Sequence, residues 1–126
     1  MADKKGNCVE IYARFAPDAL GRFGVNLIPS GREDFPIRIW CDAATGEFGV
    51  DGNVRFSGYG PAYNPEGEPL EMRVFVDRQL VEIFVNGQSC TTATNPLPTD
   101  TGFALFAETD AVVCEEWCVW RMDEKD

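Results

Sequence analysis

Residues 72–87 contain two runs of alternating apolar residues, separated by a short polar break, and the stretch ends in Asn86-Gly87. Successive side chains of a β-strand point to opposite faces, so each run places its apolar residues on one side. The stretch therefore predicts a β-hairpin with its turn at residues 77–80, and Asn86-Gly87 favours a second tight turn into a third strand. The expected cross-strand pairs are Val76 with Val81, Val74 with Ile83, and Met72 with Val85.

Short strands separated by clusters of glycine, proline and asparagine are predicted along the rest of the chain. No stretch is typical of a helix of normal length; residues 18–22 indicate a single turn at most, because Gly21 and Gly24 disfavour a helix. The longest loop is expected at residues 58–67. Eight or nine short strands indicate an antiparallel sandwich or barrel. They are predicted at residues 7–16, 22–29, 36–42, 46–51, 70–77, 80–86, 88–95, 102–108 and 111–122.

The chain of 126 residues is long enough for one domain with its own apolar core. We expect this domain at residues 7–122, between a disordered or non-native segment 1–6 and a C-terminal tail 123–126. No apolar run of transmembrane or signal-peptide type is present in the sequence. The sequence therefore does not indicate where the protein is located. If the chain is complete, we expect it in the cytoplasm; if it belongs to a longer parent protein, that protein could be secreted.

The net charge of −10, from 21 acidic and 11 basic residues, argues against binding to nucleic acid or to an anionic membrane surface. Histidine is absent, which excludes histidine-based triads and imidazole metal sites. The sequence has no phosphate loop, dinucleotide fingerprint or calcium loop, so we expect no cofactor and no bound metal.

Five cysteines without a CxxC motif do not match a disulfide framework or a zinc site. We expect reduced and mostly buried thiols, with pairing between distant strands as the alternative. Cys114 and Cys118 are four residues apart in the last predicted strand, which places them on one face but too far apart to form a disulfide.

Alternation also predicts which side chains point to the core. The strand at 102–108 is apolar on both faces, so we expect both faces to be largely buried. The last strand also has apolar side chains on both faces, which indicates that another domain or another chain covers it. In the first strand, the residues expected to point inward are Val9, Ile11, Ala13 and Phe15.

The predicted hairpin at residues 36–51 is the most informative stretch for function. Its cross-strand pairs are expected to be Asp42 with Glu47, Trp40 with Gly49, and Arg38 with Asp51. Carboxylates accept hydrogen bonds from hydroxyl groups, arginine donates them in a fixed fork, and an indole offers a flat apolar surface. This outward face suits a sugar, although the same residues also occur on ordinary solvated sheet faces. Paired acids also serve glycosidases, but with 21 acidic residues in the chain such a pair is nonspecific.

Residues 73–87, RVFVDRQLVEIFVNG, resemble a hairpin typical of the C-terminal β-sandwich of glycoside hydrolase family 32, the invertases, levanases and fructanases. Residues 41–51 also resemble a hairpin of that domain, residues 101–107 resemble its late strand, and residues 117–122 resemble its terminal strand. These matches come in the same order as in the family, so the similarity spans nearly the whole chain. The resemblance implies an all-β fold: a two-sheet antiparallel β-sandwich of the jelly-roll, concanavalin-like lectin type.

Enzymes of this family hydrolyse fructosides with acids on a separate five-bladed propeller, and nothing in this sequence resembles the catalytic segments of that propeller. The resemblance implies a non-catalytic accessory module of a fructan- or sucrose-acting enzyme. Related domains serve as family 66 carbohydrate-binding modules, which hold terminal fructose units of fructans. Six residues are predicted to bind ligand from one shared outward face, with Trp40 stacking on the sugar ring. They are Glu10, Arg38, Trp40, Asp42, Asp51 and Arg55.

A structural role is the alternative, in which the domain packs against a catalytic propeller or a second copy of itself and binds no sugar. This role predicts a contiguous apolar patch around Phe75, Phe84 and Trp117. The Asp77-Arg78 turn is expected to fix local geometry rather than to bind ligand.

Overall fold

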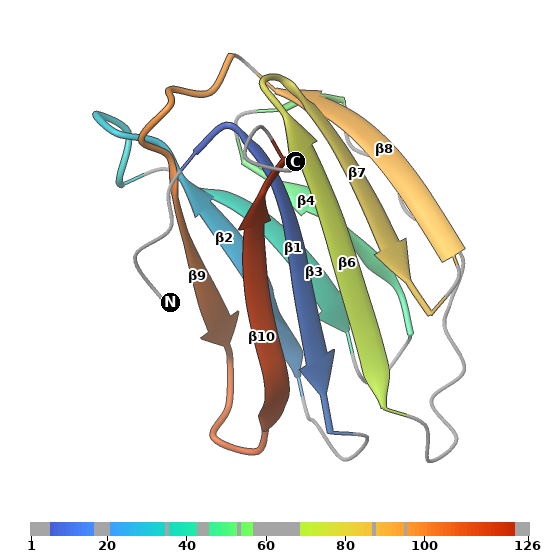
Figure 1. The fold of residues 1–126 in the computed structure, drawn as a ribbon. Coiled ribbons are helices and arrows are strands. Elements are labelled where there is room, and N and C mark those ends of the chain that lie inside the picture. Colours follow the sequence, from blue (N-terminus) through green and yellow to red (C-terminus); the bar gives the residue numbers. More distant parts are fainter. Residues whose placement is uncertain are drawn as a thin grey trace.

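Two antiparallel sheets packed face to face make up the computed structural model (Figure 1). It describes residues 6–16, 21–34, 36–42, 46–52, 54–56, 69–86, 88–94 and 96–122. The strands are β1 (Cys8–Phe15), β2 (Arg22–Ile28), β3 (Ile37–Asp42), β4 (Phe48–Asp51), β5 (Val54–Phe56), β6 (Leu70–Asp77), β7 (Leu80–Val85), β8 (Gln88–Thr94), β9 (Gly102–Ala107) and β10 (Cys114–Arg121). The described residues include no helix that is long and apolar enough to cross a membrane.

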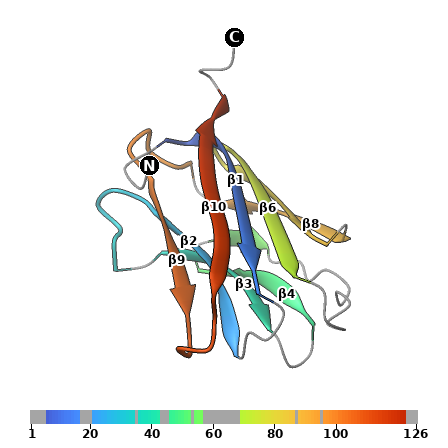
Figure 2. The ribbon, with the colours of Figure 1, turned by 60° about the horizontal axis from the view of Figure 1, so that its bottom comes forward.

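The six-stranded sheet has the order β10-β1-β6-β7-β8-β5, and the four-stranded sheet has the order β4-β3-β2-β9. The strands β1 and β10 lie side by side although they come from opposite ends of the sequence (Figure 1, Figure 2). The two sheets form separate layers rather than one closed barrel. The predicted two-sheet antiparallel β-sandwich is therefore confirmed.

β6 and β7 form the predicted hairpin in the predicted register, with Val74 opposite Ile83 at its centre. The turn residue Arg78 has a φ of 59°, and Asn86 has a φ of 48° at the start of the next turn. Asparagine tolerates this left-handed region better than most residues, which explains the turn signal in the sequence. Gly87, the second residue of that signal, lies outside the described residues.

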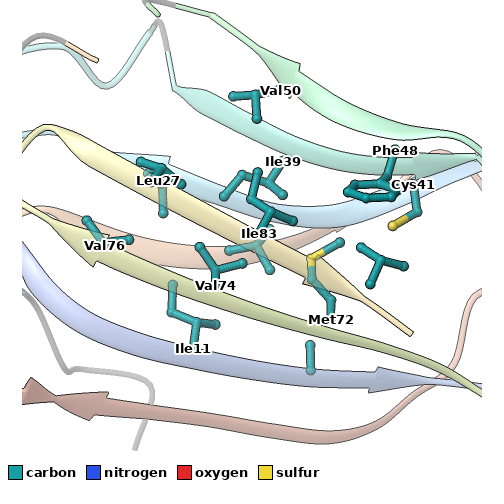
Figure 3. Close-up of a cluster of buried hydrophobic side chains, with 14 of the residues drawn as sticks. Ile11, Leu27, Ile39, Cys41, Phe48, Val50, Met72, Val74, Val76 and Ile83 are labelled. Atoms are coloured by element: carbon teal, nitrogen blue, oxygen red, sulfur yellow. The ribbon is translucent and has the colours of Figure 1, made fainter. Parts of the chain in front are cut away.

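The core lies between the two sheets and is formed by the inward face of each strand (Figure 3). The inward residues predicted for β1, which include Val9 and Ile11, are fully buried. The alternation of apolar and polar residues explains this arrangement, because removing one apolar face per sheet from water is the main driving force for folding. Residues from both sheets meet in this core, among them Ile11, Leu27, Ile39, Phe48, Val50, Met72, Val74, Val76 and Ile83.

Several boundaries differ from the predicted ones. The sequence does not predict β5, because three residues are too few to show a two-residue period. Gly6, predicted to belong to a disordered or non-native segment, is buried and donates its backbone N–H to the carbonyl of Thr101 at 2.9 Å. The predictions for residues 1–5, 18–20, 58–67 and 123–126 lie outside the described residues.

The prediction that β9 is buried on both faces is wrong, because β9 is an edge strand of the four-stranded sheet and Leu105 is exposed. β10 is likewise an edge strand of the six-stranded sheet. Its Trp117 packs against the core, whereas Trp120 on the opposite face is 40% exposed. The outer face of β10 therefore has no cover within the described part of this chain.

A β-bulge in β10 overturns the prediction that Cys114 and Cys118 share a face. The register shifts at Arg14 and Phe15, so Cys114 packs against the core while Cys118 lies opposite the outward Tyr12. All five cysteines are free thiols. Burial raises the pKa of the Cys41 thiol strongly, so this thiol is expected to be unreactive in the folded protein.

Candidate functional site

β3 lies between β2 and β4, and the outward side chains of these strands form the predicted sugar-binding surface. In the predicted register, Arg38 pairs with Asp51 and Trp40 with Gly49. The backbone N–H of Asp42 donates to the carbonyl of Glu47 at 2.9 Å, as predicted for the end of this hairpin. We call the whole surface the arginine face. It consists of Arg22, Asn26, Arg38, Trp40, Asp42, Asp51 and Phe106.

Trp40 is the central aromatic residue of the arginine face, but it is only 2% exposed. Its indole lies between Gly24 on β2 and Gly49 on β4, which leave space beside the ring. The guanidinium carbon of Arg22 lies 4.0 Å from the centroid of the Trp40 ring and covers it. The prediction that Trp40 stacks on a sugar ring is therefore wrong, because the guanidinium of Arg22 lies over the indole.

Arg22 also contacts both carboxylates of the arginine face. Its Nε lies 3.6 Å from Oδ2 of Asp42, and one terminal nitrogen lies 3.9 Å from Oδ2 of Asp51. The backbone N–H of Arg22 donates to Oε1 of Glu108 at 2.9 Å. Such half-exposed ion pairs contribute about 0–1 kcal/mol to stability, so their main effect is to hold the guanidinium over the indole.

Arg38, on β3, makes a similar contact with an aromatic ring of β9, across β2. Its Nε donates to Oδ1 of Asn26 at 3.1 Å, and its guanidinium carbon lies 4.2 Å from the centroid of the Phe106 ring. Arg22, Asn26 and Phe106 were not among the predicted site residues. Alternation along β2 gives a signal for the first two, because Arg22 and Asn26 are out of phase with its inward apolar residues.

The arginine face thus combines hydrogen-bond donors and acceptors, with charged groups of both signs. Two guanidinium groups offer more N–H donors than their present contacts use, and two carboxylates offer acceptor lone pairs. The described residues include no group of three or more Cys, Asp or Glu side chains placed to hold a metal ion. The arrangement suits a neutral ligand with several hydroxyl groups better than an ion.

Two of the six predicted ligand-binding residues do not belong to this surface as described. Glu10 lies on β1 in the six-stranded sheet and forms an ion pair with Arg73 there. The prediction that Glu10 shares a face with Arg38 is wrong, because alternation defines the faces of one strand but not which sheet the strand joins. Arg55 lies on β5 in the same six-stranded sheet, and its side chain is outside the described structure.

Residues 2–121 match the sequence model of the family described as "Glycosyl hydrolases family 32 C terminal". The chain belongs to this family. The match covers nearly all of the 126 residues, so the family 32 resemblance of the hairpin at 73–87 is confirmed. The matched family 32 region is a C-terminal module, and the catalytic propeller of the family is a separate domain that this sequence does not contain. No curated protein sequence matches the chain.

Solved structures with the same fold include a family 32 enzyme and several lectins. Exo-inulinase from Aspergillus awamori matches with a TM-score of 0.70 and 22% identity, over 91% of this chain and 24% of the enzyme. This family 32 domain therefore spans about a quarter of that enzyme. Galectin LEC-6 from Caenorhabditis elegans matches with a TM-score of 0.69 and 14% identity, over 91% of this chain and 84% of the galectin. CG-16, a homodimeric agglutinin from chicken liver, matches with a TM-score of 0.63 and 12% identity, over 94% of both chains.

Proposed function

We propose that this family 32 domain is a non-catalytic accessory module that binds fructose units of a fructan through its arginine face. The observation that supports this most directly is the presence of two arginines and two carboxylates on one sheet face. Arg22 pairs with both carboxylates, and Arg38 is held by Asn26. Membership of a family whose enzymes include an exo-inulinase indicates the class of sugar. The likeness to lectins shows a shared fold and fits the same role.

The chemistry of the arginine face matches a small polyhydroxylated ring. The free N–H groups of Arg22 and Arg38 donate to sugar oxygens, and Asp42 and Asp51 accept from sugar hydroxyls. Arg22 and Arg38 are already held over aromatic rings, so a ligand loses little side-chain entropy in ordering them. Because Arg22 covers Trp40, hydrogen bonds rather than ring stacking supply the specificity of this site.

The variant Arg38→Ala is expected to weaken fructan binding about tenfold or more, because a hydrogen bond to a charged group contributes roughly 1.5–3 kcal/mol. Isothermal titration with levan, inulin and fructose measures this change. Arg32→Ala is the matched control, since Arg32 lies on the loop after β2, outside the arginine face, and is only partly buried. A wild-type protein that shows neither heat nor a shift in melting temperature with all three sugars would overturn the proposal.

Family membership also favours a second role, packing against a catalytic propeller or another copy of the chain. The contiguous patch predicted around Phe75, Phe84 and Trp117 does not form, because Trp117 faces the core. The exposed Trp120 on the outer face of β10 replaces it as the candidate contact.

If the domain self-associates through this face, the mass from light scattering rises with concentration in the wild type and returns to the monomer value in Trp120→Ser. Val113→Ser is the control, because Val113 is an even more exposed apolar residue but lies in the connection between β9 and β10. A mass that stays at 14.0 kDa at every concentration would rule out self-association.

A further inference from the structure

The outer face of the six-stranded sheet has a cavity of about 430 Å³ that the arginine face does not share. One residue from each of three neighbouring strands forms its floor: Tyr12 on β1 pairs with Arg73 on β6, which pairs with Phe84 on β7. We call this the β6 pocket. It is lined by Tyr12, Glu71, Arg73, Phe75, Phe84 and Asn86.

Contacts among these residues hold the polar groups of the β6 pocket in fixed positions. The hydroxyl of Tyr12 donates to Oε2 of Glu71 at 2.5 Å. This hydrogen bond, with a smaller contribution from burial, raises the pKa of Tyr12, so the hydroxyl keeps its proton near neutral pH. The guanidinium carbon of Arg73 lies 4.8 Å from the centroid of the Tyr12 ring, and one of its terminal nitrogens pairs with Glu10.

The end of the pocket next to β7 is fixed by the backbone. Oδ1 of Asn86 accepts from the backbone N–H of Glu71 at 2.7 Å, and its Nδ2 donates to the carbonyl of Pro69 at 3.3 Å. The backbone N–H of Asn86 donates in turn to the carbonyl of Glu71 at 3.1 Å. A ligand that enters the pocket therefore meets side chains that are already ordered, which lowers the entropy cost of binding.

An apolar wall completes the β6 pocket. The rings of Phe75 and Phe84 meet edge to face, with their centroids 5.8 Å apart and their planes at 89°. Phe84 is 37% exposed, so part of its surface is open to a ligand. A few fixed polar groups beside an aromatic surface are the usual composition of a small-molecule site.

The charges of the β6 pocket select among ligand classes. The carboxylates of Glu10 and Glu71 outnumber the single guanidinium of Arg73, so the pocket disfavours an anion such as a phosphate. A neutral polyhydroxylated ring suits the same groups, because its hydroxyls donate to Glu71 and accept from the N–H groups of Arg73 that Glu10 leaves open. Its apolar face can then lie against Phe84.

We propose that the β6 pocket is a second sugar-binding site, which takes one neutral monosaccharide unit. It lies on the outer face of one sheet, and the arginine face lies on the outer face of the other, so the two sites point away from each other. A module of this kind holds two separate glycan segments at once. The proposal is independent of the one for the arginine face, since the two sites share no residue.

Amide NMR spectra recorded during titration with fructose, and separately with glucose, test this proposal. One or both sugars are expected to shift the backbone amides of Tyr12, Arg73 and Phe84, with the fitted binding at least about tenfold weaker in Arg73→Ala. Glu71→Gln keeps an acceptor for Tyr12 but removes the charge, and it is expected to weaken binding less than Arg73→Ala. Arg38→Ala is the matched control, and it should leave the shifts in the β6 pocket unchanged.

The outcomes separate the two sites. Saturable shifts in the β6 pocket that survive Arg38→Ala but not Arg73→Ala support the second site, whether or not the arginine face responds. Shifts confined to residues of β2 and β3 support only the arginine face and overturn the second site. The second site is also overturned if no pocket amide responds to either sugar, or if a folded Arg73→Ala variant binds as well as the wild type. Because the side chain of Arg73 is 42% exposed, this variant is expected to fold.

Discussion

Replacing Gly24 with alanine is expected to lower the free energy of unfolding by about 3 kcal/mol or more, at the upper end of the cost of overpacking a core. A Cβ at this position would lie 2.0 Å from the carbonyl oxygen of Ile39, which belongs to the backbone of the neighbouring strand β3. A backbone atom in the middle of a sheet cannot rotate away, so β2 and β3 would have to separate. Gly24 also lies between Trp40 and Phe106, so the same change should disturb the arginine face.

Urea denaturation followed by tryptophan fluorescence measures this loss, and Gly102→Ala is the matched control. Gly102 is also a strand glycine of the four-stranded sheet, but its nearest neighbour would lie 3.9 Å from the added Cβ. Alanine there is expected to be neutral or to stabilise the protein by up to about 1 kcal/mol, since it reduces the freedom of the unfolded chain. Equal midpoints for the two variants would contradict the steric explanation.

Truncating Ile83 to alanine is expected to cost about 2–5 kcal/mol, because Ile83 is fully buried between the sheets and its removal leaves a cavity. Ile83 lies at the centre of the β6–β7 hairpin, opposite Val74, and faces the four-stranded sheet (Figure 3). The loss should appear as a lower denaturation midpoint with an unchanged slope.

Leu80→Ala on the same strand is the control for this truncation. Leu80 is 51% exposed, so losing a similar volume there is expected to cost about 1 kcal/mol or less. Comparable losses in the two variants would mean that the hairpin is not the centre of the core.

Local periodicity predicted most of the fold. The alternation in β6 and β7 specified their pairing to the residue, and the same was true of Arg38 with Asp51 across the hairpin of β3 and β4. These predictions succeed because a hairpin register depends on residues that are close in sequence. The burial of one apolar face per strand is likewise a local property that the alternation displays directly.

Predictions that required knowing which strands are neighbours were less successful. Glu10 was assigned to the same face as Arg38, although their strands belong to opposite sheets. The cover that Arg22 provides for Trp40 arises across β2 and β3, and a single bulge separated Cys114 from Cys118. Each of these features depends on contacts between segments that are distant in sequence. The alternation within one strand does not identify the strands that pair with it.

The pairing of β1 with β10 has a consequence for how the protein is made. β1 is synthesised before the other described strands, yet one of its edges pairs with β6 and the other with β10, whose last residue is Arg121. Pairing between such distant segments is slow, because the chain must close a long loop before any contact forms. Until translation reaches β10, one edge of β1 lacks its partner strand. The domain therefore completes its folding only after nearly all of its residues have been synthesised.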